Sequence, residues 1–195
     1  MPGTPRIPLL QRAEWTDEAR EVFAVMQGDN GRENGPIYDF ILLLAQHPAL
    51  TVPFLNYSRY VLVDSTLDHR VREIVTLYVA WTCRSEYEWL SHVREGLQRG
   101  LTHEDFEAIR QGASSPRWTD FERSLLRLVD EMRDGHTISD ATWAALSPHF
   151  DTRGMMDLVF TVANYITLSA IVNGLRVPPE AGAGGAALAE EFGVP

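Results

Sequence analysis

The octapeptide SEYEWLSH, residues 85–92, holds the side chains best suited to proton transfer in this sequence. Glu88 and His92 are four residues apart, so a helix would place both on one face. An imidazole can accept or donate a proton near neutral pH, and a carboxylate one turn away can orient it and raise its pKa. Glu–His pairs at this spacing also occur on ordinary exposed helix faces, so this interpretation stays open.

The start of the same stretch also has the spacing of a helix capping box, because Ser85 and Glu88 are three residues apart. If Ser85 caps the helix, the free backbone N–H groups and the helix dipole would lower the pKa of Glu88 and favour an anion nearby. If Glu88 instead folds back onto the Ser85 amide, it is structural and His92 acts alone. Tyr87 and Trp89 would belong to the core or to a pocket wall.

Glu73 is the third candidate, in the preceding segment RVREIVTLYVAW. It lies near the edge of the apolar stripe of a predicted helix, so its carboxylate could point into a groove between two helices. A salt bridge with Arg70, Arg72 or a neighbouring helix is the simpler interpretation. Glu73, Glu88 and His92 could together bind zinc or iron, but no further ligand joins them in the sequence. We therefore predict no metal and no cofactor.

Two further polar side chains lie in apolar surroundings. Cys83 is the one cysteine of the chain and follows a long apolar segment, which favours a buried structural thiol over a nucleophile. Asn164 lies inside the uncharged run 158–172, and a buried amide needs a hydrogen-bond partner. That partner could be a backbone carbonyl, a neighbouring helix or a ligand.

The elements that would position these residues are helices. Capping residues recur before segments of helical periodicity, and no segment shows the alternation of a strand; the caps are Thr16, Asp68, Ser85, Thr102, Thr119, Ser139 and Asp151. We expect an all-α domain of about eight helices over residues 14–177. Residues 1–13 are predicted to be an extended lead-in, and residues 178–195 a flexible Gly/Ala-rich tail.

Composition limits the classes of partner. The 195 residues are 45% hydrophobic, and 17 basic against 27 acidic residues give a net charge of −10, which argues against a nucleic-acid binder. A single cysteine and the absence of a recognisable signal peptide predict a cytoplasmic protein. The run 158–172 is short for a membrane span, so we expect no membrane contact. Because residues 155–172 are apolar on all sides, we expect a second subunit to cover part of that helix.

The patterns LxxRxRE (residues 67–73) and YEWxxH (residues 87–92), with the Gly-Leu at 100–101, resemble the carboxymuconolactone decarboxylase family. That family includes the alkylhydroperoxidase D-like proteins, and the resemblance covers roughly residues 40–178. It implies an all-α fold whose subunits intertwine as a homo-oligomer, which we expect to be a trimer, hexamer or dimer.

In the redox branch of this family a CxxCxxxH motif carries the chemistry, with a glutamate twelve residues before its first cysteine. The matching positions here are Ser85, Glu88 and His92, and the earlier glutamate is Glu73. Cys83 lies outside the matching positions. The resemblance therefore points to a thiol-free branch, in which a peroxidase or disulfide reductase activity is not expected because one thiol cannot complete a dithiol cycle.

The decarboxylase branch implies a lyase or related proton-transfer enzyme acting on a small organic acid, lactone or enolisable carbonyl compound. His92 would donate or relay the proton, Glu88 would orient it, and Glu73 would set the charge or act as a second acid–base group. Arg70 or Arg72 would hold a substrate carboxylate. Two alternatives remain: a non-catalytic ligand-binding or assembly protein on the same scaffold, and a metal-dependent enzyme that uses the three site residues.

Overall fold

The computed structural model describes residues 4–36, 38–180 and 185–195, and these ranges contain ten α-helices and no strand. The predicted all-α class is confirmed, with ten helices where about eight were expected. Their bounds are α1 Asp17–Asn34, α2 Asp39–Leu44, α3 Pro48–Arg59, α4 His69–Thr82, α5 Glu86–Gln98, α6 His103–Gln111, α7 Asp120–Gly135, α8 Asp140–Leu146, α9 Thr152–Leu175 and α10 Gly185–Phe192.

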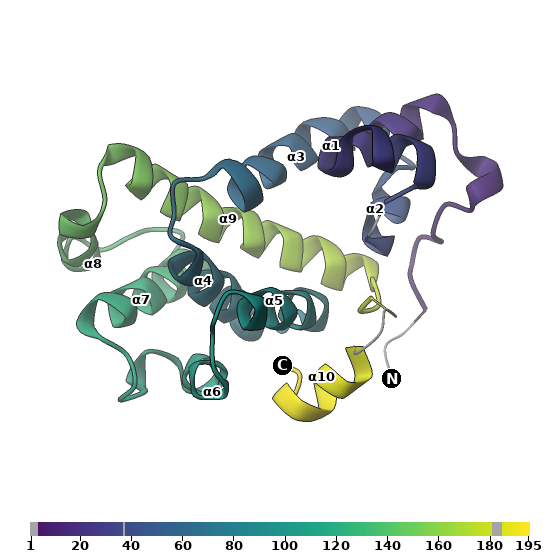
Figure 1. Ribbon diagram of the computed structural model, residues 1–195. Helices are drawn as coiled ribbons and strands as arrows, with labels where there is room; N and C mark the ends of the chain where they lie inside the picture. The colour runs from purple at the N-terminus through teal and green to yellow at the C-terminus, as the bar shows by residue number, and fades with distance from the viewer. Residues whose placement is uncertain (1–3, 37, 181–184) are drawn as a thin grey trace.

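The long helix α9 runs through the middle of the molecule, with α1 and α3 on one side and α4 to α7 on the other (Figure 1). Helix α4 packs against α5, α7 and α9 and is buried from Val71 to Ala80. A π-helical turn, η2 (Tyr60–Asp64), continues α3 and contacts α9. The side chain of Asp157 holds it there by accepting hydrogen bonds from the Tyr60 hydroxyl at 2.9 Å and the Thr66 N–H at 2.7 Å.

The helix starts agree with the capping residues of the sequence. Side-chain oxygens accept hydrogen bonds from the first-turn N–H groups at α1, α4, α5, α7, α8 and α9; the residues are Thr16, Asp68, Ser85, Thr119, Ser139 and Asp151. These bonds satisfy amides that have no partner inside the helix. The local sequence therefore determines where these six helices begin.

The C-terminal segment differs from the predicted flexible tail. Residues 185–192 form α10, which packs against α5. Phe192 is buried against Phe106 with ring centroids 4.9 Å apart, and the Trp89 indole N–H donates to the Gly193 carbonyl at 2.9 Å. Residues 181–184 lie outside the described ranges. The segment is ordered by tertiary contacts that the Gly/Ala-rich sequence does not reveal.

Helix α9 is the one helix in the described ranges that is long and apolar enough to cross a bilayer by length and composition, and 56% of its most apolar window is buried inside the protein. A central helix of a globular domain passes the same test. Its buried residues include Leu158, Val162, Tyr165 and Leu168, which face the main core.

Candidate active site

A tight reversal between α4 and α5 brings the three candidate residues together. Arg84 takes a left-handed conformation with φ 53°, and the Ser85 N–H donates to the Ala80 carbonyl at 2.8 Å. The Ser85 hydroxyl accepts from the Glu88 N–H at 3.4 Å and caps α5. Because the Ser85 amide is already bonded to Ala80, the Glu88 carboxyl is free of the capping box. The capping question is therefore answered: Ser85 caps the helix, and Glu88 faces elsewhere.

Glu73 and His92 form a buried pair across the two helices. The Glu73 Oε2 lies 2.8 Å from His92 Nδ1, and its other oxygen accepts from the Arg72 guanidinium at 3.2 Å. Arg72 is itself fixed by a 2.6 Å hydrogen bond from its Nη1 to the Leu62 carbonyl in the π-helical turn. The carboxylate of Glu73, with 0% of its surface exposed, therefore joins a cation on one side to the imidazole on the other.

Glu88 lies on the opposite side of the imidazole. Its Oε2 is 3.9 Å from His92 Nε2, and both side chains are buried. His92 is therefore flanked by two carboxyl groups, one at each ring nitrogen. Tyr165 of α9 packs against the imidazole in a T-shaped arrangement, with ring centroids 4.9 Å apart and ring planes at 89°.

The two carboxyl groups differ in charge. Although Ser85 caps α5, the pKa of Glu88 is raised and not lowered as the capped helix start predicts. Burial brings it to about 7, because the positive charge of His92 offsets only part of the desolvation. Burial also acts to raise the pKa of Glu73, but the charges and hydrogen bonds of His92 and Arg72 lower it below its ordinary value. At neutral pH Glu73 is thus ionised, while a large share of Glu88 holds a proton.

The imidazole belongs to the same charge system. Burial alone would lower the pKa of His92, but the charge and hydrogen bond of Glu73, with Glu88 and Glu95 adding to them, raise it above its ordinary value. The pair of Glu73 and His92 therefore favours a carboxylate beside a protonated imidazole. When His92 is neutral, a proton on Nδ1 facing Glu73 leaves the lone pair on Nε2, on the side of Glu88.

A cavity of about 320 Å³ lies beside His92 and Glu88. It is lined by α5 and α9, with α1, α2, α3, the π-helical turn and the start of α4 completing the wall, and its lining is mostly apolar. The described residues that line it are Met26, Tyr38, Phe40, Leu55, Ser58, Leu62, Val63, His69, Tyr87, Glu88, Ser91, His92, Arg94, Glu95, Arg99, Asn164, Tyr165 and Leu168. Glu73 is not among the described residues of the wall, but it contacts His92, which is.

Two of the predicted substrate-binding residues line this cavity and two others are structural. Tyr87 and Asn164 are part of the wall. Ser85 is buried as the cap of α5. Trp89 is buried in the core, 5.0 Å from the Trp81 ring centroid and bonded to Gly193. The prediction that Ser85 and Trp89 contact substrate is therefore not supported by their positions.

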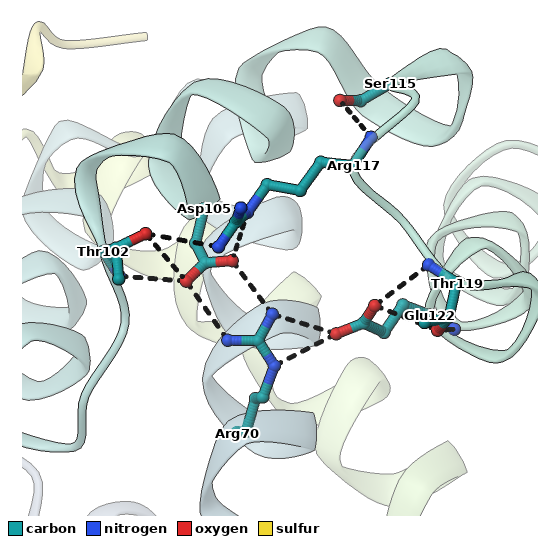
Figure 2. A network of polar contacts seen from close by, with 7 residues as sticks. All are labelled: Arg70, Thr102, Asp105, Ser115, Arg117, Thr119 and Glu122. Atoms are coloured by element: carbon teal, nitrogen blue, oxygen red, sulfur yellow. Dashed lines mark hydrogen bonds and ion pairs between the residues drawn. The ribbon is translucent and has the colours of Figure 1, made fainter.

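The two predicted arginine anchors also have other partners. Arg70 lies in a polar network at the starts of α4, α6 and α7, where it pairs with Asp105 and Glu122, each at 2.9 Å (Figure 2). Arg117 pairs with the same Asp105 at 2.7 Å. Arg72 is held by Glu73 and Leu62, and neither Arg70 nor Arg72 is among the described residues of the cavity wall. Both therefore have structural partners, and their positions give no support to the predicted contact with a substrate carboxylate.

Several wall residues were not identified from the sequence. Tyr165 and Ser58 reach the cavity from α9 and α3, and no spacing within one helix connects them to His92. His69 is exposed and also lines the cavity. Arg94 could have been found by extending the helical face of Tyr87 by seven residues along α5.

The metal alternative lacks a suitable ligand arrangement. Among the described residues there is no group of three or more His, Cys, Asp or Glu side chains placed to hold a metal ion. Both carboxylate oxygens of Glu73 already have partners, one in Arg72 and the other in His92. Glu88 and His92 alone would offer an ion two ligands.

Solved structures share this fold. The AhpD core of an uncharacterized peroxidase-related protein from Ralstonia eutropha JMP134 has a TM-score of 0.66 at 16% identity, covering 99% of this chain and 98% of that chain. A protein of unknown function from Agrobacterium tumefaciens, described in relation to antioxidant defence and AhpD, has a TM-score of 0.64 at 21% identity, covering 70% of this chain and 94% of that chain. At these identities the likeness concerns the fold.

The sequence comparison is more specific about the family. No curated protein matches the chain significantly. Residues 48–131 match the model of the carboxymuconolactone decarboxylase family, and this range runs from α3 into α7 and includes Glu73, Glu88 and His92. Ser85 and Glu88 stand at the positions that the resemblance assigns to the thiols of the redox branch. Residues 48–131 are therefore similar to the carboxymuconolactone decarboxylase family, and the chain has an AhpD-like helical fold.

Proposed function

We propose that this protein is a cofactor-free acid–base enzyme, a lyase or related proton-transfer enzyme that acts on a small organic acid, lactone or enolisable carbonyl compound. One observation carries the proposal: a buried imidazole stands between two carboxyl groups at the wall of a cavity of about 320 Å³, and the pKa of Glu73 is lowered whereas that of Glu88 is raised to about 7. Pairs of titratable groups with opposite shifts are typical of acid–base sites.

Each group has a distinct role in this reaction. Glu73 orients the ring through Nδ1. In the molecules whose His92 has released its proton, Nε2 takes the proton from a carbon next to a carbonyl group. The electron pair of the broken C–H bond moves to the carbonyl oxygen and forms an enolate. Protonated Glu88 then returns a proton to the carbon, and the proton held by His92 restores Glu88 directly or through water.

The same site can support a decarboxylation. When the bond between a carboxylate and its neighbouring carbon breaks, carbon dioxide leaves and the electron pair passes to the conjugated carbonyl oxygen. The resulting enolate takes a proton at carbon from Glu88 or from protonated His92, and water restores that proton. Burial of both acids keeps the developing charge in a low-dielectric setting, where a nearby protonated imidazole stabilises it strongly.

One of the two similar proteins is peroxidase-related and the other is linked to antioxidant defence. The residues of this chain favour chemistry without sulfur. The chain has one cysteine. Cys83 is half-buried, lies outside the described cavity wall, and burial raises the pKa of its thiol. A thiol with a raised pKa is a poor nucleophile, and a dithiol cycle would need a second one.

The proposal is tested by turnover of a panel of enolisable acids and lactones, measured as carbon dioxide release and as substrate loss. His92→Gln and Glu88→Gln should each lower turnover by about 10²-fold or more, because each removes a group that transfers a proton. Glu86→Gln is the matched control: it makes the same change two residues away on α5, outside the described cavity wall, and should leave turnover unchanged.

Circular dichroism confirms that each variant is folded before its turnover is compared. Equal turnover in wild type, His92→Gln and Glu88→Gln would contradict the proposal. Ligand binding without consumption of any panel member would instead favour the non-catalytic binding protein.

A further inference from the structure

Arg94 is a cation at the cavity wall, and its charge acts through space on Glu180 and Tyr38. Within the described ranges its guanidinium makes no hydrogen bond or ion pair, although it lines the cavity. The two acids near it are engaged: Glu95 pairs with Arg99 at 3.7 Å, and Glu180 accepts a hydrogen bond from the Tyr87 hydroxyl. An arginine fork left open beside an apolar cavity is suited to a carboxylate, which it can bind with two parallel hydrogen bonds.

Asn164 gives a second and independent indication. Its side chain is 1% exposed and lines the same cavity from α9. Its Oδ1 accepts a hydrogen bond from the Ser58 hydroxyl at 2.9 Å, but its Nδ2 has no partner among the described residues. A buried N–H donor without an acceptor is costly, so such a group commonly marks the place of a ligand oxygen or a water molecule.

The other residues of the cavity wall limit the size and the polarity of the ligand. Phe40, Leu55, Tyr165 and Leu168 make much of the lining apolar, and the cavity of about 320 Å³ is at the small end of ligand pockets. Because a large share of Glu88 is protonated at neutral pH, the acid beside His92 repels an anionic ligand only weakly. A compact apolar ring or chain with two separate oxygen acceptors fits these demands.

We propose that the cavity binds a compact, largely apolar carboxylate that carries a second carbonyl group, with Arg94 holding the carboxylate and the Asn164 amide donating to the carbonyl oxygen. The donor on Asn164 would stabilise negative charge on that oxygen when a neighbouring C–H bond is broken. The assignment of that carbonyl as the reacting group rests on the proposed acid–base function, whereas the binding roles of Arg94 and Asn164 do not.

Isothermal titration calorimetry with 4-oxocyclohexanecarboxylate tests the arginine. Arg94→Met should weaken binding by about tenfold or more, because a hydrogen-bonded charge is lost, and should leave the neutral methyl ester of the same acid within about twofold. Arg127→Met on α7 removes an equal charge from an exposed position and should change neither affinity. Equal weakening of acid and ester by Arg94→Met would overturn the anchor.

Cyclohexanecarboxylate, which lacks the ketone, tests the amide. Wild type should bind the keto acid about tenfold more tightly than this analogue, since the analogue leaves Nδ2 unpaired. Asn164→Leu should remove that preference, and thermal unfolding verifies that the variant is folded. A preference that persists in Asn164→Leu would overturn the role of the amide, and no measurable binding of the keto acid to wild type would overturn the ligand class.

The binding and the reaction can fail separately. Keto-acid binding that depends on Arg94, without turnover of any substrate, would leave the ligand class standing and contradict the enzyme. Turnover of a carboxylate substrate with an unchanged KM in Arg94→Met would contradict the anchor and leave the acid–base function standing.

Discussion

His92 stands between two glutamates whose charges differ because their surroundings differ. Glu73 faces the Arg72 guanidinium at 3.2 Å and has a lowered pKa, whereas burial raises the pKa of Glu88 to about 7 because the charge of His92 offsets only part of the desolvation. One carboxyl group therefore orients the ring, while the other stores a proton near neutral pH. This division of roles follows from the positions of the partners and not from the residue types.

The raised pKa of Glu88 predicts a pH dependence of stability. An unfolded glutamate loses its proton near about pH 4.3, but folded Glu88 retains it up to about 7. Between these values the folded state binds more protons, so the free energy of unfolding should fall as the pH rises. Urea unfolding of wild type and Glu88→Gln at pH 5 and pH 8 measures this effect, with the decline smaller in the variant. Identical declines in both proteins would show that Glu88 is not a stored acid.

The sequence could predict the three central residues because two helices carry them. Glu88 and His92 share a face by their spacing, and Glu73 lies on the neighbouring helix of the same hairpin. The ion pairs of Arg70 could not be predicted, because its partners, Asp105 and Glu122, lie on α6 and α7. Contacts between elements that are far apart in the chain produce no characteristic residue spacing in the sequence, so they could not be predicted.

At the scale of elements, the network of Figure 2 joins the starts of three helices. Asp105 is almost fully buried and accepts from Arg70, Arg117 and the Thr102 N–H. Burial alone would raise the pKa of Asp105, but these hydrogen bonds outweigh it and hold the pKa far below its ordinary value. The network thus fixes α6 against α4, on which Glu73 lies.

Removing Arg70 should therefore destabilise the protein. Arg70→Met leaves Asp105 with two of its partners, and Arg70 is 39% exposed, so we expect a loss of about 1–2 kcal/mol in the free energy of unfolding. Arg32→Met removes exposed ion pairs with Glu21 and Asp29, which solvent screens, and should cost clearly less stability than Arg70→Met. Chemical denaturation at pH 7 compares the two. A loss from Arg70→Met no larger than that from Arg32→Met would contradict the stabilising role of the network.

Helix starts were predictable, and the last helix was not. Ser85 and Asp151 cap helices through bonds to residues three positions later, so a short sequence window contains the signal. Helix α10 has no such signal, because contacts of Phe192 and Gly193 with α5 and α6 order it. From the sequence alone its residues are predicted to be a flexible tail, because the surface of α5 and α6 against which they pack is not visible there.

At the scale of the whole molecule, one surface remains apolar. Trp143 of α8 and Met156 and Phe160 of α9 are 46%, 55% and 51% exposed and lie along one groove. We propose that a second copy of the chain covers this surface in a homo-oligomer, because contiguous exposed apolar side chains favour association. The same cover would complete the burial of α9.

Light scattering coupled to size exclusion tests this proposal. The wild-type protein should elute at a multiple of the 22.0 kDa subunit mass. Phe160→Asp should shift it toward the monomer, because the new charge would have to be buried at the interface. Leu50→Asp, which places the same charge on an exposed apolar site of α3, is the control and should leave the mass unchanged. A monomeric wild type would contradict the oligomer.

The most direct measurement of the proton transfer is the exchange of hydrogen for deuterium at the carbon beside the ketone of 4-oxocyclohexanecarboxylate, followed by NMR in deuterated water. A site that removes and returns this proton predicts exchange faster than in buffer, slowed by about 10²-fold in His92→Gln and in Glu88→Gln. Exchange that wild type does not accelerate, under conditions where calorimetry shows the acid to be bound, would contradict the acid–base role of His92 and Glu88.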